Sequence, residues 1–260
     1  MEQRMAEIAE RLYRAEQERT VIAPITEDLP EMSMETAYGI QMLNVEKKVG
    51  GGDRIVGHKI GLTSKPMQRQ LGVGEPDFGH LFSSMRYTSG HPVDHPLIQP
   101  KVEPELAFLL KEDLPGPGVD VQDVLRATSH VVPAIEVIDS RIADWKIRLA
   151  DTIADNASSG CFVLGEVGTD VHAANLTTTG AVLMVNGEVV QTGAAAAVMG
   201  HPAAAVAWLA NKLSSLGTTL KAGHVVLSGA VTAAVPVRPG DHILLNFGKL
   251  GRVEFTLRSP

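Results

Sequence analysis

The feature that most constrains this chain is a pair of carboxylates inside an apolar segment, residues 101–110. Glu103 and Glu105 stand two residues apart, and the period of two in a β-strand places both side chains on one face. Apolar neighbours such as Leu106 and Phe108 indicate that the segment is packed, yet burying an unpaired ionised carboxylate is costly. We therefore expect the fold to bring a positive charge to this face, and a hard cation is one solution.

A third carboxylate, Glu136, stands in the middle of a second apolar run, residues 131–138. No Lys or Arg lies within four residues to pair with it. A Glu-x-Glu pair alone is more often on the solvated face of an antiparallel sheet. Glu136, which has apolar neighbours on both sides, shifts the interpretation toward a metal site. Carboxylate oxygens are the ligands that Mg²⁺ and Mn²⁺ prefer, so Glu103, Glu105 and Glu136 are predicted to hold a divalent metal with positions open for a substrate.

Composition excludes several classes of protein. A formal charge of −7 and an aromatic content of 4% argue against a nucleic-acid partner, which would need a basic face and stacking side chains. The single cysteine, Cys161, excludes an internal disulfide and is expected to be a small buried hydrophobe. The charged start of the chain is unlike a signal peptide, and no apolar run approaches the roughly 20 residues of a membrane span. We expect a cytoplasmic protein.

The order of patterns along the 260 residues predicts an α+β fold. An amphipathic helix is expected over 3–19 and a second one from the N-cap Ser33 to the glycines at 50–52. A strand with Lys59 at its centre follows, and the turn formers of 72–80 predict a loop that holds Asp77. From residue 98 onward short strands dominate, with helices between them, which predicts a curled sheet.

Three local signals fix elements in this part of the chain. Asp120 is a predicted N-cap of a short helix, and Pro202 is the predicted start of another helix. The Asn186-Gly187 pair predicts the turn of a β-hairpin.

Six motifs spread along the chain together form a specific pattern. They are Gly57-His-Lys-Ile-Gly-Leu-Thr-Ser64, Pro76-Asp-Phe-Gly79, Val102-Glu-Pro-Glu-Leu-Ala107, Ala134-Ile-Glu-Val-Ile-Asp-Ser-Arg-Ile142, Asp151-Thr-Ile-Ala-Asp-Asn-Ala-Ser-Ser159 and Pro239-Gly-Asp241. With these motifs the chain resembles, over nearly its whole length, the fumarylacetoacetate hydrolase superfamily, and within it the 2-hydroxypenta-2,4-dienoate hydratases of bacterial aromatic and steroid ring degradation. The resemblance implies a barrel-like mixed β-sheet with flanking helices, a small N-terminal helical region over 1–75 and a catalytic domain over 76–260, or one domain of both. It also implies a homo-oligomer.

The same resemblance implies that Lys59 and Asp77 transfer protons beside a metal held by the three glutamates. Pattern alone does not predict this, because isolated Lys and Asp residues in loops are usually solvated. His58 is predicted to orient a group in the site, with a structural hydrogen bond as the alternative. Asn156 and Ser158 are predicted to bind the substrate carboxylate or to cap a turn.

The implied activity is metal-dependent addition of water to 2-hydroxypenta-2,4-dienoate, or a close 2-hydroxy-2,4-dienoate, to give 4-hydroxy-2-oxopentanoate. The carboxylate and 2-oxygen of such a substrate match two adjacent positions on an octahedral Mg²⁺ or Mn²⁺. Alternatives are a 4-oxalocrotonate decarboxylase, which typically has Leu where His58 stands and no acid at 77, and a hydratase of the seven-carbon diacid. A C–C hydrolase or a non-catalytic subunit beside a pathway aldolase or decarboxylase fits less well.

Overall fold

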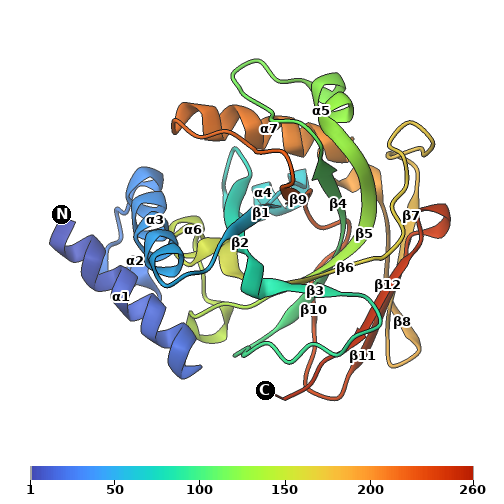
Figure 1. The fold of residues 1–260 in the computed structure, drawn as a ribbon. Helices are drawn as coiled ribbons and strands as arrows, with labels where there is room; N and C mark the ends of the chain where they lie inside the picture. The colour runs from blue at the N-terminus through green and yellow to red at the C-terminus, as the bar shows by residue number, and fades with distance from the viewer. Residues whose placement is uncertain (1, 260) are drawn as a thin grey trace.

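Two amphipathic helices form the N-terminal part of the chain, as their sequence pattern predicts. The computed structural model describes residues 2–259. Helix α1 (Glu2–Glu18) buries Ile8 and Leu12, and α3 (Met34–Gly50) begins at Ser33, whose hydroxyl accepts a hydrogen bond from the Thr36 amide. The short α2 (Ile25–Asp28) lies between them in the chain, and α6 (Leu149–Ala154) contacts α3 (Figure 1).

The centre of the molecule is a curled, mixed sheet (Figure 1), which confirms the predicted fold class. Within residues 2–259 it has eight strands in the order β2-β1-β9-β4-β5-β6-β3, with β10 paired to β4. The β1–β9 and β3–β6 pairs are parallel and the others antiparallel. The strands are β1 (Ile55–Gly61), β2 (Asp77–Phe82), β3 (Arg86–Thr88), β4 (Lys101–Leu110), β5 (Thr128–Ile138), β6 (Ser159–Leu164), β9 (Val225–Leu227) and β10 (Val235–Pro236).

A smaller antiparallel sheet contacts β5 and β6 through its strands β11 and β12. Its order is β12-β11-β7-β8, and the predicted Asn186-Gly187 turn joins β7 to β8. Both turn residues have positive φ, as a two-residue hairpin with this sequence requires. The strands are β7 (Gly180–Val185), β8 (Glu188–Ala194), β11 (His242–Asn246) and β12 (Arg252–Thr256).

Helices α5 and α7 pack on each other beside the larger sheet (Figure 1). Helix α7 (Pro202–Ser215) begins as predicted at Pro202, and the ring of His201 accepts a hydrogen bond from the Ala203 amide. Helix α5 (Val121–Ala127) has the expected N-cap, Asp120. The remaining helical elements are α4 (Lys65–Leu71), η1 (Ser83–Met85), η2 (Ala143–Trp145), η3 (Asn156–Ser158), η4 (Ala195–Ala197) and η5 (Gly248–Leu250).

The prediction of a loop over residues 72–80 is wrong for its second half. Asp77 is the first residue of β2, which is buried along its whole length and pairs with β1. Asp77 and Gly79 are residue types that favour turns, but tertiary pairing with β1 overrides this local preference. The division into domains at residues 75 and 76 stays a prediction, and β1, on its N-terminal side, lies in the same sheet as β2.

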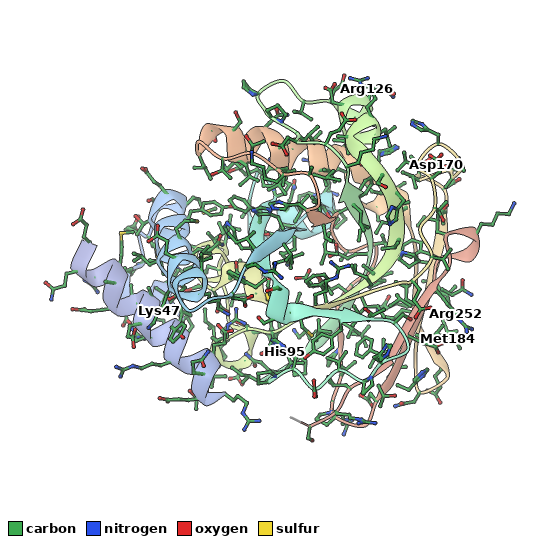
Figure 2. The ribbon with its side chains drawn as sticks, in the orientation of Figure 1. Lys47, His95, Arg126, Asp170, Met184 and Arg252 are labelled. Carbon is green, nitrogen blue, oxygen red and sulfur yellow. The ribbon has the colours of Figure 1, made fainter. Side chains whose placement is uncertain are left out.

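Packing fills the interior of the curled sheet with side chains, as Figure 2 shows. Among the largest fully buried side chains are Phe78, Phe108, Phe162 and Phe247. Over the described residues, no helix combines the length and the apolar character needed to cross a membrane.

Candidate metal centre

The register of β4 against β5 brings the three predicted glutamates together. Glu103 pairs with Glu136 across the two strands, and Glu105 lies two residues along β4 on the same face. One carboxylate oxygen from each lies within 4.8 Å of the others. Glu105 and Glu136 are fully buried, whereas Glu103 keeps partial exposure. The cluster therefore has its solvent-accessible side at Glu103.

The oxygens of this cluster have fewer partners than buried carboxylates normally have. Among the residues described, Glu105 Oε1 accepts no hydrogen bond, and Glu136 Oε2 has an ion pair with the Lys59 ammonium, 3.2 Å away. Glu105 Oε2 accepts a hydrogen bond from the Gly229 amide at 2.7 Å. Burial, and then repulsion from Glu136, raises the pKa of Glu105 well above its ordinary value, and burial raises that of Glu136 to about 7. Three converging carboxylates with so few partners fit a divalent cation of the Mg²⁺ or Mn²⁺ type.

Lys59 lies beside the cluster. Its Nζ is 3.2 Å from Glu136 Oε2, as an ion pair, and donates a hydrogen bond of 3.0 Å to the Ala157 carbonyl. The residue is only 3% exposed, so Lys59 is not solvated as isolated lysines usually are. Burial alone would lower the pKa of Lys59, but attraction to Glu136, and then to Glu103 and Asp77, raises it above its ordinary value.

Asp77 reaches the same face of the sheet from β2. It pairs with Gly61, two residues along β1 from Lys59, so both side chains point to one side. Asp77 is buried, its Oδ1 has no hydrogen-bond partner within the described chain, and burial raises its pKa against the attraction of Lys59. A Cβ atom on Gly61 would lie 2.1 Å from Asp77 Oδ1, so the carboxylate occupies the space that this glycine leaves.

The register also shows that Lys59 shares its face with the glutamates. Lys59 pairs with Leu227 of β9, and Leu227 pairs with Ala107 of β4. Ala107 has the same strand parity as Glu105 and Glu103. Five of the predicted site residues, Lys59, Asp77, Glu103, Glu105 and Glu136, thus lie on one face of the sheet.

His58 lies on the opposite face, away from this group. Its ring is 4.8 Å from that of His80, its partner across β1 and β2, and 5.8 Å from that of His224. His80 Nδ1 lies 3.0 Å from Gln41 Oε1 on α3. Burial lowers the pKa of His58 well below its ordinary value and that of His80 to about 4, so both are neutral. The structure does not bring His58 to the carboxylates.

Asn156 and Ser158 lie in the turn η3, close to Lys59. The Asn156 side chain accepts a hydrogen bond from the His80 amide at 2.8 Å and donates one to the His80 carbonyl at 3.0 Å. The Ser158 hydroxyl is buried and lies 3.1 Å from the hydroxyl of Thr152. The contacts of Asn156 match the structural alternative that the sequence left open, while substrate binding by the two residues stays a prediction.

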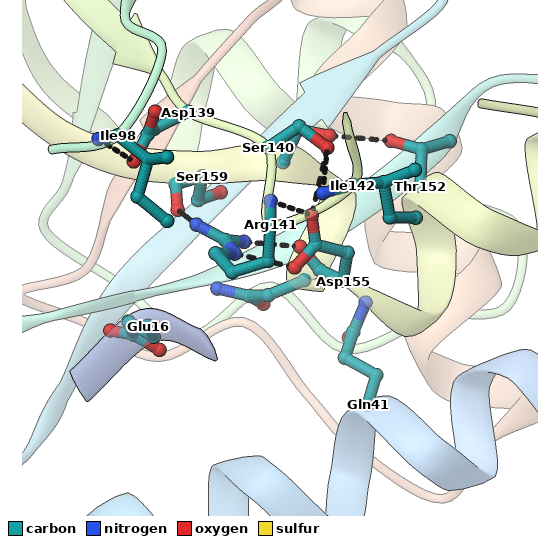
Figure 3. Close-up of polar contacts among 12 residues, drawn as sticks. Glu16, Gln41, Ile98, Asp139, Ser140, Arg141, Ile142, Thr152, Asp155 and Ser159 are labelled. Carbon is teal, nitrogen blue, oxygen red and sulfur yellow. Dashed lines mark hydrogen bonds and ion pairs between the residues drawn. The ribbon is translucent and has the colours of Figure 1, made fainter. Parts of the chain in front are cut away.

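A buried ion pair that sequence reasoning missed supports this turn. Arg141 Nε donates to Asp155 Oδ1 at 2.5 Å, and its other nitrogens donate to the carbonyls of Ser159 and Asp155 at 2.9 and 2.6 Å (Figure 3). Asp155 also accepts from the Arg141 amide at 2.9 Å. In the sequence, Arg141 and Asp155 lie in two of the motifs, 134–142 and 151–159. That the two side chains pair with each other depends on the tertiary fold.

A hollow near this turn lies apart from the carboxylates. Its lining includes Glu16 of α1, Lys48 of α3, Arg141 and Asn156. The residues described around it do not include the three glutamates, Lys59 or Asp77. Clustered buried charge, rather than the shape of a cavity, therefore identifies the candidate site.

Comparisons with known proteins agree with this fold. Residues 52–258 match the family model described as fumarylacetoacetate (FAA) hydrolase, C-terminal. The chain is 46% identical to the 2-hydroxyhexa-2,4-dienoate hydratase of Comamonas testosteroni, over 95% of this chain and 96% of that protein. It is 44% identical to the 2-keto-4-pentenoate hydratase of Paraburkholderia xenovorans strain LB400, over 99% and 96%. The 4-oxalocrotonate decarboxylase of Pseudomonas putida G7, solved with magnesium and adipate, superimposes with a TM-score of 0.95 at 40% identity, over 99% and 98% of the two chains.

Proposed function

This chain belongs to the fumarylacetoacetate hydrolase family, and we propose that it is a divalent-metal-dependent hydratase of 2-hydroxypenta-2,4-dienoate or a close 2-hydroxy-2,4-dienoate. The product is the corresponding 4-hydroxy-2-oxo acid, in the meta-cleavage degradation of aromatic or steroid rings. The observation that carries the proposal is the set of five ionisable side chains on one face of the sheet, with three carboxylates close enough to share one cation. Hydratases with this substrate class are among the most similar proteins.

Glu103, Glu105 and Glu136 are the residues that would hold Mg²⁺ or Mn²⁺. When bound, such an ion supplies a Lewis acid that anchors and polarises a 2-oxo acid. The protein holds the three carboxylates in place through the β4–β5 ladder and through the Gly229 amide on Glu105. The magnesium in the related decarboxylase supports a metal of this class.

Lys59 and Asp77 provide the proton chemistry that the reaction needs. Ketonisation moves the enol proton to solvent and places a proton on C5, and water then adds its hydroxyl to C4 while C3 takes a proton. Asp77, buried with a free Oδ1, is suited to accept a proton from the water. Lys59 Nζ, held between a carbonyl and a carboxylate, is suited to donate a hydrogen bond or a proton to the substrate.

Decarboxylation of 4-oxalocrotonate is the second candidate, because the solved decarboxylase shares the fold over nearly the whole chain. The acid at position 77 is the feature by which the sequence resembles hydratases instead. Its burial on the same face as Lys59 supports hydration.

The decisive test is the ultraviolet absorbance of freshly generated 2-hydroxypenta-2,4-dienoate and its six-carbon homologue with the protein. We expect the dienol band to disappear only with Mg²⁺ or Mn²⁺ present, and chromatography to identify the 4-hydroxy-2-oxo acid. Asp77→Asn and Lys59→Met should each lower kcat by about 10²- to 10⁴-fold, the usual contribution of a general acid or base. Release of CO₂ from 4-oxalocrotonate without hydration of either dienoate would contradict the proposal and establish the decarboxylase.

A further inference from the structure

We infer that Asn156 is a positioning residue for Lys59, acting through the carbonyl of Ala157; this role rests on the proposed function of Lys59. Asn156 is engaged with β2, and its neighbour Ala157 accepts the hydrogen bond of the Lys59 ammonium. The side chain of Asn156 therefore fixes the position of a catalytic group without touching the substrate.

The backbone of this turn has an unusual shape. Asn156, Ala157 and Ser158 have φ values of 51°, 50° and 55°, three consecutive residues in the left-handed region. Alanine and serine rarely adopt this conformation, which persists only where surrounding contacts impose it. The Ser158 amide donates to the Asp155 carbonyl, and the Ser158 carbonyl accepts from the Asp139 amide. The conformation points the Ala157 carbonyl at Lys59 Nζ, 3.0 Å away.

Asn156 attaches this turn to an edge of the sheet. Strand β2 is at one end of the strand order, and the Asn156 amide group bonds both the N–H and the C=O of His80 in the way a neighbouring strand would. The turn also lies directly on the strand, because a Cβ on Gly79 would be 2.4 Å from the Asn156 carbonyl oxygen. Because Gly79 pairs with Lys59, the attachment is made at the level of the lysine.

The Ala157 carbonyl and Glu136 hold Lys59 Nζ from two directions. If the carbonyl moved, the ammonium would follow the carboxylate alone and change its place relative to a bound substrate. The three glutamates stay in place, because β4 and β5 position them. Loss of the Asn156 amide should therefore affect the chemical step far more than metal binding.

The chain contains a matched control. Asn211 on α7 makes the same pair of bonds to one backbone residue: it accepts from the Val119 amide and donates to the Val119 carbonyl, both at 2.9 Å. Asn211→Ala removes an equivalent pair of hydrogen bonds, between α7 and Val119, and neither residue belongs to the candidate site. It is expected to lower the thermal midpoint and to leave kcat unchanged.

The experiment compares Asn156→Ala with Asn211→Ala, both loaded with Mn²⁺. We expect Asn156→Ala to lower kcat by about 10- to 100-fold, as misplacement of a reacting group does. The Mn²⁺ dissociation constant from calorimetry and KM should change less than about 3-fold, as expected when only the chemical step loses an interaction. In the Lys59→Met background, Asn156→Ala should have no further effect on kcat. An undiminished kcat in folded Asn156→Ala, or equal additional losses with and without Lys59, would overturn the inference.

A structural readout makes the test independent of activity. Crystal structures of both variants with Mn²⁺ should show the Lys59 to Ala157 hydrogen bond lost in Asn156→Ala and kept in Asn211→Ala; its retention in both would refute the positioning role. If Asn156→Ala does not fold, Asn156→Asp keeps the acceptor for the His80 amide and loses only the donor, so a smaller decrease in kcat is expected. Wild type and Asn211→Ala that fold but do not hydrate the dienoate would instead refute the proposed function.

Discussion

Two adjacent residues of β1 lie on opposite faces of the larger sheet, and the two faces differ in how they bury polar side chains. Lys59 points to the side of Asp77 and the three glutamates, and His58 points to the side of His80 and His224. Both side chains are buried, at 3% and 2% exposure. On the histidine face, burial is accommodated by keeping the rings neutral. On the lysine face, ionisable groups are concentrated, and Glu105 Oε1 and Asp77 Oδ1 have no hydrogen-bond partner among the described residues.

The contrast indicates where function lies in a fold that buries polar groups on both sides. Neutral rings packed on an aromatic side chain, as His58 on Phe78, serve the core. Buried carboxylates that repel one another need a positive charge or added protons to stay buried. The face that gathers these ionisable groups is therefore the candidate functional one.

The largest expected effect disrupts the carboxylate face. Glu136→Gln keeps the shape of the side chain but removes a charge from the metal cluster, so we expect Mn²⁺ affinity to fall by at least about 100-fold, because ligand charge sets the affinity of such sites. Calorimetric titration measures it. Glu188→Gln, an exposed carboxylate on β8, is the control. Full metal-dependent turnover by Glu136→Gln would show that the cluster is not the metal site.

A methyl group at position 61 should disturb Asp77 alone. In Gly61→Ala the new Cβ would overlap Asp77 Oδ1, so the carboxyl must move, and we expect kcat to fall by about 10²-fold with metal affinity unchanged. Gly74→Ala is the matched control, because a Cβ there has no neighbour within 4 Å. Steady-state kinetics measures kcat, and calorimetry measures the metal affinity. A normal kcat in Gly61→Ala would show that catalysis does not depend on the position of the Asp77 carboxyl group.

The histidine face should make the protein sensitive to acid. Unfolded histidines titrate near pH 6.5, whereas burial lowers the pKa of His80 to about 4 and lowers that of His58 well below its ordinary value. Their stabilising contribution is therefore complete above about pH 6.5 and is lost as the pH falls toward 4. The free energy of unfolding in urea, wild type minus His58→Leu, should decrease by about 1 kcal/mol per pH unit below pH 6.5. A difference that is constant between pH 7.5 and 5 would contradict a neutral buried His58.

The smallest expected effect tests whether the two faces are separate in function. Because His58 faces away from the carboxylates, His58→Leu should change KM for the dienoate by less than about 3-fold, the range of a residue that makes no contact with substrate. Its Nδ1 has no hydrogen-bond partner among the described residues, so the substitution should not destabilise the protein at pH 8. A tenfold increase in KM would support the substrate-orienting role that the sequence predicted.

Much of the site was predictable because local rules determine it. The period of two placed Glu103 and Glu105 on one face, and apolar neighbours singled out Glu136 as the third candidate ligand. The helices capped by Ser33 and Asp120 and the hairpin at Asn186 also followed from local chemistry. The roles proposed for Lys59 and Asp77 came from family resemblance, since isolated Lys and Asp residues are usually solvated and pattern alone gave them no function.

Local sequence was sufficient to determine most of the strands, which residues alternate on each face and which carboxylates lie inside apolar runs, because these depend on neighbours within a few positions. Only the tertiary structure decided that Lys59 pairs with Glu136, that His58 joins the opposite face and that Arg141 and Asp155 fix the turn at Asn156. Those contacts join residues distant in the chain, and their geometry depends on strand register and on burial, which set the cost of every unpaired charge.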